Sequence, residues 1–238
     1  MNDMKLSGFK RLIWGGVILS LAIPLFVLLF KYLALKQTLQ ASLENGDYYS
    51  VIGWTNTMEK LNYKADVCFF GNSLTCYSNF QKDFPSKKIV ILGYPGQGLI
   101  GMIKRSNQIS AVHPDKIFLM AGINDLNLNK MSFDEFCGYY EQLVDSILSS
   151  NNHADVFLQS ILPVNHSINL LHPNTEIIVK ANDFIKKLAS RKRLTYIDLY
   201  NLYSDEKGEL KKQLTSDGIH LKETAYHIWS SKIQLYIE

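Results

Sequence analysis

Four short polar fragments of this sequence contain the residue types that acyl transfer requires. Ser73 and Asn124 each follow a short apolar run, and near the C-terminus Asp217 lies three positions before His220. Three glycines follow another apolar run: Gly93, Gly96 and Gly98. A serine hydroxyl is a weak nucleophile until a base removes its proton, and a histidine base needs a carboxylate to hold its ring. Fixed amide donors then stabilise the negative charge that grows on the attacked carbonyl oxygen.

Each fragment alone also has an ordinary structural explanation. A serine between a strand and a helix is commonly an N-cap, and glycines or an Asn-Asp pair after a strand commonly form turns. A pair with the spacing of Asp217 and His220 also arises easily by chance. The fragments therefore indicate a catalytic site only if the fold brings them to one place.

Short apolar runs alternate with amphipathic segments along the body of the chain. Five runs predict strands, at 66–70, 88–92, 116–120, 155–162 and 194–199. Three segments with apolar residues three and four positions apart predict helices, at 99–112, 133–149 and 176–191. Ser132 followed by Glu135 has the pattern of a capping box, which predicts the start of the second helix.

This alternation predicts the fold class. Strands buried on both faces and separated by helices of ten or more residues imply right-handed crossovers and a parallel sheet. We therefore expect a three-layer α/β/α sandwich with a parallel sheet of about five strands, of the flavodoxin-like kind. In such sheets the loops at the carboxyl ends of the strands gather at one edge, so the four polar fragments would meet there.

With its fragments in this order, the sequence resembles the SGNH hydrolases, also called the GDSL esterase and lipase family. The resemblance covers the body from about residue 66 to the C-terminus. The family is named for four residues, which here are Ser73, Gly98, Asn124 and His220. The first block reads Gly-Asn-Ser-Leu, so that Asn72 replaces an aspartate that is not the nucleophile in the family.

The resemblance also implies the role of each residue. Ser73 would be the nucleophile, His220 its base and Asp217 the carboxylate that orients the base. The oxyanion hole would consist of the backbone amides of Ser73 and Gly98 and the side chain of Asn124. Gly93 and Gly96 compete with Gly98 for this role, and we prefer Gly98 because it opens the following helix, where its amide is free. Asp125 is expected to brace its loop.

Other catalytic chemistries fit the sequence less well. The order Ser…Asp…His also suits an α/β-hydrolase, but there the nucleophile lies in G-x-S-x-G, and position 75 is threonine. We expect no metal and no cofactor, because the other histidines and the cysteines lack metal-ligand spacing. These residues are His113, His153, His166, His172, His227, Cys68, Cys76 and Cys137.

The N-terminal segment predicts a membrane anchor. Residues 12–30 contain no charge, and these 19 residues are enough to cross a hydrocarbon core of about 30 Å as a helix. The run is longer than that of a cleaved signal peptide and has no small-residue cleavage pattern. Lys5, Lys10 and Arg11 precede it, whereas Lys31 and Lys36 follow, which favours a cytoplasmic N-terminus. We therefore predict a cytoplasmic segment at 1–11, a single transmembrane anchor at 12–35, a stalk at 36–64 and a hydrolase domain at 65–238 outside the cytoplasm.

The charge of the chain argues against nucleic acid as a partner. The formal net charge is +3, but residues 1–36 carry +4, so the remaining body carries −1. A nucleic-acid binder needs a basic surface to neutralise phosphates, and the body has no such surplus. The expected partners are the lipid bilayer, through residues 12–35, and an ester substrate.

Together these features predict a membrane-anchored, extracytoplasmic serine ester hydrolase. An anchored enzyme reaches surface glycans, envelope polymers and lipids, and the sequence has no further long apolar segment to form an acyl-chain tunnel. We therefore expect small acyl groups, chiefly acetyl, to be removed from carbohydrate or envelope glycan. Three alternatives remain open: an acyltransferase to glycan, a lysophospholipase or lipase with the same triad, and a non-catalytic envelope binding or scaffold module. Retention of all four polar fragments argues against the last.

Overall fold

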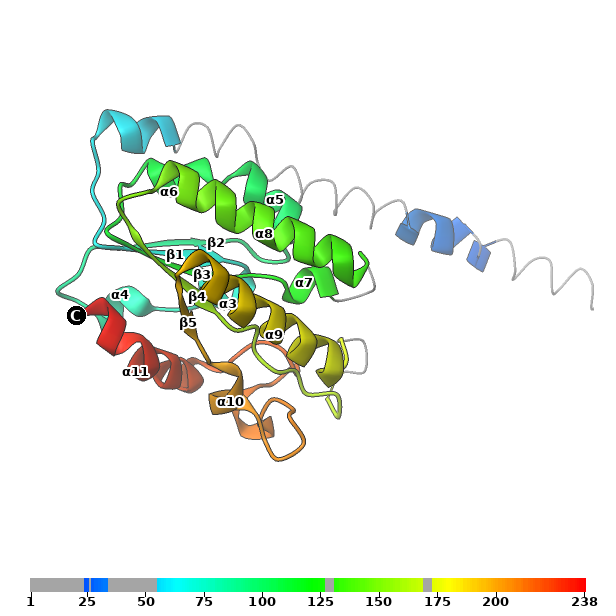
Figure 1. Cartoon of the computed structure of the whole chain (residues 1–238). Coiled ribbons are helices and arrows are strands. Elements are labelled where there is room, and N and C mark those ends of the chain that lie inside the picture. Colours follow the sequence, from blue (N-terminus) through cyan, green and yellow to red (C-terminus); the bar gives the residue numbers. More distant parts are fainter. Residues whose placement is uncertain (1–23, 26, 34–54, 127–130, 169–172) are drawn as a thin grey trace, which may run out of the picture. The chain divides into compact units, whose positions relative to one another are not determined.

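The computed structural model describes residues 24–25, 27–33, 55–126, 131–168 and 173–238 (Figure 1). The chain divides into two compact units, Met1–Leu43 and Glu44–Glu238. In the first unit the described residues are helical, and their apolar side chains, such as Leu28 and Phe30, are exposed. Within the described ranges, no helix has the length and hydropathy needed for a membrane span. Most of the predicted anchor at 12–35 and of its flanking segments lies outside the described residues, so the anchor stays a prediction.

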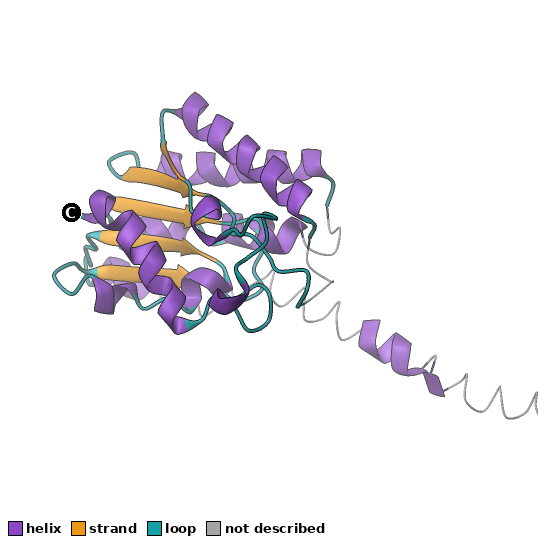
Figure 2. Cartoon of the chain, turned by 90° about the horizontal axis from the view of Figure 1, so that it is seen from below, coloured by secondary structure: helices purple, strands orange, loops and turns teal. Residues whose placement is uncertain are grey.

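The second unit is built on a parallel sheet, as the alternation of apolar runs predicts. Its five strands are β1 (Val67–Gly71), β2 (Ile89–Gly93), β3 (Lys116–Met120), β4 (Asp155–Gln159) and β5 (Thr195–Ile197). Their order is β2-β1-β3-β4-β5, and all run in the same direction (Figure 2). Gly71 lies opposite both Gly93 and Met120, so the chain leaves three neighbouring strands at the same level.

Helices cover both faces of this sheet, which confirms the predicted three layers (Figure 1). One face of the sheet is covered by α5 (Leu99–Lys104), α6 (Asn107–Ser110), α8 (Phe133–Ser150) and α9 (Thr175–Lys192). Those on the other face are α4 (Phe80–Asp83), α10 (Tyr200–Tyr203) and α11 (Tyr226–Ile237). Other short elements are a helical segment at 55–60, α3 (Ser73–Cys76), α7 (Ile123–Leu126) and the 3-10 turns η2 (Lys212–Leu214) and η3 (Glu223–Ala225).

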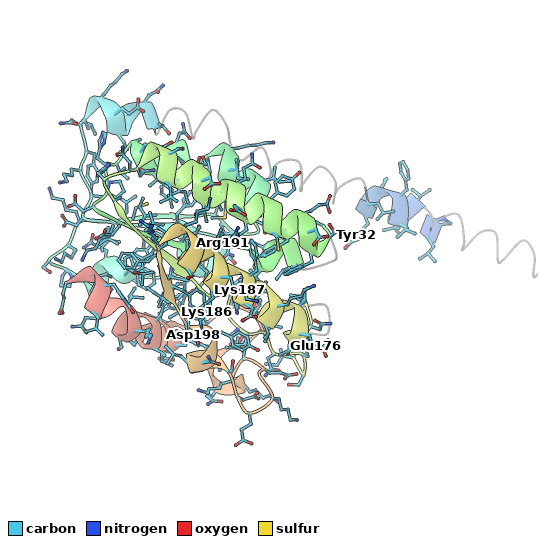
Figure 3. The ribbon with its side chains drawn as sticks, in the orientation of Figure 1. Tyr32, Glu176, Lys186, Lys187, Arg191 and Asp198 are labelled. Carbon is cyan, nitrogen blue, oxygen red and sulfur yellow. The ribbon has the colours of Figure 1, made fainter. Side chains whose placement is uncertain are left out.

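Alternating side chains of the strands form a separate core on each face. Successive residues of a strand point to opposite faces, so Phe69 and Phe70 enter different clusters. On the α11 face, Phe69, Phe118 and Phe157 stack across neighbouring strands, with ring centroids 5.0 and 4.6 Å apart. On the other face the apolar stripes of α8 and α9 pack against the sheet, whereas their outer surfaces carry charges such as Lys187 and Arg191 (Figure 3).

Three predicted elements end earlier than expected. The strand predicted at 194–199 ends at Ile197. The strand predicted at 155–162 stops at Gln159, because the side-chain amide of Asn182 bonds both the N–H and the carbonyl of Ile161 at 2.8 and 2.9 Å. Ile161 is therefore buried without a strand partner. The helix predicted at 99–112 is divided into α5 and α6, and the break falls at Arg105, whose side chain is buried.

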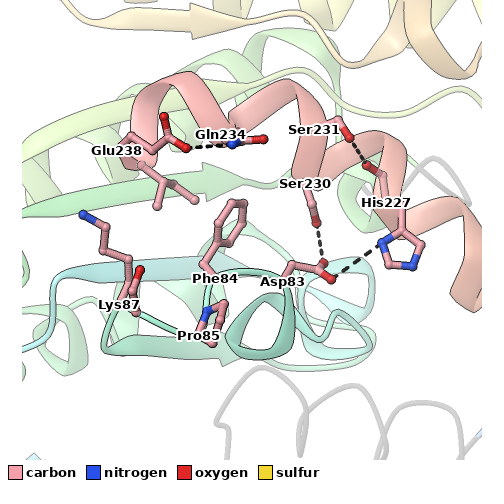
Figure 4. Close-up of a pocket in the computed structure, with 11 residues that line it drawn as sticks. Asp83, Phe84, Pro85, Lys87, His227, Ser230, Ser231, Gln234 and Glu238 are labelled. Carbon is pink, nitrogen blue, oxygen red and sulfur yellow. Dashed lines mark hydrogen bonds and ion pairs between the residues drawn. The ribbon is translucent and has the colours of Figure 1, made fainter.

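Helix α11 is held against the sheet and against α4 by polar contacts. The indole of Trp229 donates a hydrogen bond to the Gln159 side chain at 2.6 Å. On the side toward α4, Ser230 donates to Asp83 at 2.5 Å beside a pocket, and His227 also faces that carboxylate at 3.6 Å (Figure 4). The phenol of Tyr226 donates to the carbonyl of Leu74 at 2.9 Å, which connects α11 to the helix that begins with Ser73.

Candidate active site

Ser73 begins α3 immediately after β1, at the edge of the sheet where the predicted fragments should meet. The side chain of Asn72 caps this helix by accepting the Leu74 N–H at 3.0 Å. The asparagine therefore still accepts a hydrogen bond where the family name has aspartate. Ser73 as a whole is only 6% exposed.

The short helix α3 lies directly against the end of β2, and Gly93 makes this close approach possible. A Cβ atom at position 93 would lie 2.3 Å from the backbone nitrogen of Cys76 and 2.7 Å from its Cα. Both distances are far below van der Waals contact, and backbone atoms cannot turn aside as a side chain can. The position of the nucleophile thus depends on the absence of a side chain at residue 93.

The structure brings Ser73, Asp217 and His220 together in one hydrogen-bonded chain. The Ser73 Oγ lies 2.9 Å from Nε2 of His220, although 147 positions separate the two residues. The other ring nitrogen of His220, Nδ1, lies 2.6 Å from Oδ2 of Asp217. With Asp217 ionised, the ring proton stays on Nδ1, and this N–H donates a hydrogen bond to the carboxylate. Nε2 is then free to accept the hydrogen bond of the serine O–H.

Local hydrogen bonds hold the Asp217 carboxylate in its ionised form. Partial burial by itself raises the pKa of this group, but the hydrogen bond with His220 and the backbone N–H groups of Ile219 and His220 lower it to about 2. Those backbone donors lie 3.0 and 2.8 Å from Oδ1. Asp217 therefore carries a full negative charge at neutral pH, as the orientation of the histidine requires.

Gly98 is the N-cap of α5, and it lies against the carboxylate of Asp125. A Cβ atom at position 98 would be 2.5 Å from Oδ1 of Asp125, so a larger residue here would displace this carboxylate. The same oxygen accepts the N–H of Leu99 at 2.8 Å, so Asp125 braces the loop as expected. Of the competing glycines, Gly93 belongs to β2 and Gly96 lies in the preceding turn with φ of +73°.

Asn124 and Gly98 are connected through one peptide group. The side-chain amide of Asn124, on α7, donates to the carbonyl of Gln97 at 2.9 Å, and the N–H of the same peptide belongs to Gly98. This bond uses one of the two protons on the amide nitrogen. Within the described part of the chain, neither the N–H of Ser73 nor that of Gly98 donates a hydrogen bond, as expected at helix N-termini.

Two residues at the site carry no motif and escaped the sequence analysis. Tyr77 is 54% exposed, and its ring meets that of His220 edge-on, with centroids 5.4 Å apart. Arg105 is buried behind the strand ends and bonds the side chain of Gln97. The sequence gives no signal for Arg105, which lies between Lys104 and Ser106 in the polar middle of the helix predicted at 99–112. Among the described residues, no group of three or more His, Cys, Asp or Glu is placed to hold a metal ion.

Comparison with known families settles the class of this site. The profile of the GDSL-like lipase/acylhydrolase family matches residues 69–228, which spans all four polar fragments. The chain belongs to this family. The resemblance noted from the sequence is therefore confirmed, and the protein is an acylhydrolase of the GDSL, or SGNH, type.

Solved structures share the fold of this GDSL-like acylhydrolase. A candidate platelet activating factor from Streptococcus pneumoniae is 25% identical with a TM-score of 0.74, and the match covers 85% of this chain and 97% of that one. A candidate acylhydrolase from Bacteroides fragilis is 23% identical, with a TM-score of 0.66 and coverage of 77% and 93%. The acetyl xylan esterase AlAXEase is 22% identical, with a TM-score of 0.59 and coverage of 72% and 99%. No protein with a curated function matches the sequence.

Proposed function

We propose that this acylhydrolase is a serine esterase that removes small acyl groups, chiefly acetyl, from carbohydrate or envelope glycan. The observation that carries the proposal is the contact chain from Ser73 Oγ through His220 to Asp217, with distances of 2.9 and 2.6 Å. An esterase needs a nucleophile, a base and an orienting carboxylate in this arrangement.

In the first half of the reaction, Nε2 of His220 takes the proton of the Ser73 hydroxyl while Oγ attacks the ester carbonyl. The tetrahedral intermediate collapses when His220 gives that proton to the departing alcohol, which leaves an acyl-serine. Water then attacks the acyl group, His220 again takes and returns one proton, and the carboxylic acid leaves. Asp217 stabilises the imidazolium form in each half without becoming protonated.

The oxyanion of each tetrahedral intermediate needs fixed donors, and we assign this role to three groups. They are the backbone N–H groups of Ser73 and Gly98 and the second amide proton of Asn124. Donors that are already in place stabilise the developing charge without reorganising, which is why this contribution is commonly the largest.

Two observations support a small acyl group on a sugar. The exposed Tyr77 ring beside His220 offers an amphipathic surface on which a sugar ring could stack. Acetyl xylan esterases also use this fold, as AlAXEase shows. A long acyl chain would need apolar lining, since each buried methylene contributes about 0.8 kcal/mol. The sequence has no long apolar segment beyond residues 12–30 that could form such a lining.

The decisive experiment compares acyl length and acceptor in the full chain, purified in detergent. We expect kcat/KM to fall from p-nitrophenyl acetate through butyrate to palmitate, and acetate to be released from acetylated xylan or peptidoglycan fragments. A rise toward palmitate would replace the proposal with a membrane-facing lipase. Transfer of acetyl onto a sugar, without release of free acetate, would replace it with a transferase.

Anchoring with the hydrolase domain outside the cytoplasm is part of the same proposal. It rests on the uncharged run at 12–30 and on the excess of cations before it. Protease added to intact cells or spheroplasts should digest the body of the chain. Survival of the body, under conditions that digest known outer domains, would reverse the orientation. A mature protein that begins near residues 37–43 would instead show a cleaved signal.

A further inference from the structure

Arg105 is a buried cation that lies behind the carboxyl ends of β1 and β2. Its residue is 3% exposed, at the break between α5 and α6. The guanidinium is sandwiched between the rings of Phe70 and Tyr94, each centroid 4.3 Å from its central carbon. Burial lowers the pKa of Arg105 to about 9, so the group remains protonated at neutral pH. Among the described residues it forms no ion pair with a carboxylate.

The guanidinium instead uses its donors on the backbone and on two glutamines. One terminal nitrogen bonds the carbonyls of Gly71 and Leu92 at 3.0 and 3.2 Å, and the other bonds Leu92 at 3.2 Å and the side chain of Gln108 at 3.3 Å. The Nε–H donates to the side chain of Gln97. A guanidinium has five N–H donors, and these bonds occupy all five.

Two of these partners lead directly to the donors of the oxyanion hole. The Gly71 carbonyl lies two residues before Ser73, at the point where β1 passes into the nucleophile helix. Gln97 immediately precedes Gly98, and its carbonyl is the group that Asn124 bonds. A single rigid, planar side chain therefore connects the two loops whose backbone N–H groups the mechanism needs.

We propose that Arg105 is a positioning residue of the oxyanion hole, which holds the Ser73 turn and the Gly98 loop at a fixed separation. The proposal rests on the proposed function, because it assigns the backbone N–H groups of Ser73 and Gly98 to one oxyanion. That charge is present only in the tetrahedral states, so misplaced donors should lower kcat more than they raise KM. A displacement of about 1 Å can reduce turnover by about 10².

The two glutamine partners of Arg105 supply a matched pair of variants. Gln97→Leu and Gln108→Leu each remove a buried amide and leave one guanidinium donor unpaired, so their structural penalties should be alike. Only Gln97 adjoins an oxyanion donor, whereas Gln108 lies on α6 and otherwise contacts Tyr94. Each variant is made in the full chain, and its functional sites are counted by titration with a fluorophosphonate. The melting temperature is then measured, with kcat and KM for p-nitrophenyl acetate per titrated site.

We expect Gln97→Leu to lower kcat by about tenfold to 10², with KM within about twofold of the wild-type value. Gln108→Leu should keep kcat within about threefold at a similar loss of melting temperature. Arg105→Lys keeps the charge but not the five-donor geometry, so it should lower kcat at least as far as Gln97→Leu does. If Arg105→Lys fails to fold, the two glutamine variants decide the question.

Equal kcat values for the two glutamine variants would overturn the positioning role. The same conclusion would follow if Gln97→Leu reduced only the titratable fraction of protein and left kcat per site unchanged. If the wild-type protein neither reacted with the fluorophosphonate nor hydrolysed the ester, the proposed function itself would be overturned. The wild-type measurement therefore separates the two failures.

Discussion

The two sides of the active site are positioned in different ways. Ser73 is almost fully buried, and its helix is held by backbone atoms of neighbouring strands and by a tyrosine from α11. On the other side, the Asp217 and His220 side chains are 50% and 35% exposed. Their orientation comes from hydrogen bonds within residues 215–220, where Thr215 also accepts the N–H of Gly218 at 2.9 Å.

This difference predicts which substitutions each side of the active site can tolerate. The nucleophile depends on close packing between distant segments, so a small increase in volume nearby should displace it. The Asp217–His220 loop depends on charge and on short-range hydrogen bonds, so it should respond to a change in charge with little loss of packing. Variants that alter volume on one side and charge on the other therefore test the comparison.

The largest expected effect comes from Ser73→Ala, which removes the group on which the two sides converge. In this variant, turnover of p-nitrophenyl acetate should fall by about 10⁶ and fluorophosphonate labelling should vanish. His220→Ala should have nearly the same effect, because the two residues act as a unit. Ser78→Ala is the matched control, since Ser78 is also buried in this segment but bonds only the carbonyl of Thr75. Full activity of folded Ser73→Ala protein would show that another residue is the nucleophile.

Asp217→Asn changes the charge of the exposed side while keeping its shape. An amide can donate to Nδ1 of His220, which places the ring proton on Nε2 and prevents that nitrogen from accepting the serine proton. We expect kcat to fall by about 10⁴, and the melting temperature near pH 7 to fall slightly because the stabilising charge of the carboxylate is lost. A loss of less than about tenfold in kcat would mean that Asp217 does not determine the tautomer.

Gly93→Ala tests the packed side by volume alone. The added methyl would overlap the backbone of Cys76, so α3 must move, and we expect kcat to fall by about 10² and stability by about 1–3 kcal/mol. Gly138→Ala is the control, because a Cβ at this exposed position of α8 would meet nothing within 4 Å. That change should stabilise the protein by about 0.5–1 kcal/mol in thermal or urea unfolding. Wild-type kcat in Gly93→Ala would show that the strand end is less tightly packed than described.

The smallest expected effect is a pH dependence of stability that belongs to the exposed side. The pKa of Asp217 is about 2 in the folded protein, below its ordinary value of 3.8, so the stabilising contribution of this carboxylate is fully present above about pH 4. It should be lost as the pH falls from about 4 to 2. Melting temperatures of the wild type and of Asp217→Asn should therefore converge over this range. Curves that stay parallel down to pH 2 would show that the carboxylate contributes no such stability.

Local sequence signals predicted much of the fold. The helix predicted at 133–149 is α8, and its capping box is present, with the Ser132 N–H 2.7 Å from the Glu135 carboxylate. The helix predicted at 176–191 is α9, within one residue at each end. All five strands occur in the predicted places, because buried parallel strands form continuous apolar runs that are visible in any sequence. The strand predicted at 155–162 was too long, because the backbone of Ile161 bonds the side-chain amide of Asn182 on α9 in place of a neighbouring strand. No local sequence pattern shows this contact.

The residue types of the candidate site were likewise visible in the sequence, since nucleophile, base and carboxylate chemistry requires particular side chains, and their order is that of the family. The distances between these side chains, by contrast, follow from the packing of the folded chain. The contact between Ser73 and His220 spans 147 positions, and the approach of α3 to Gly93 depends on a crossover between strands. The role inferred for Arg105 was invisible for the same reason. Its partners lie on β1, on β2 and in the Gly98 loop, and only the packing of a parallel sheet brings the carboxyl ends of two strands and this loop within reach of one side chain.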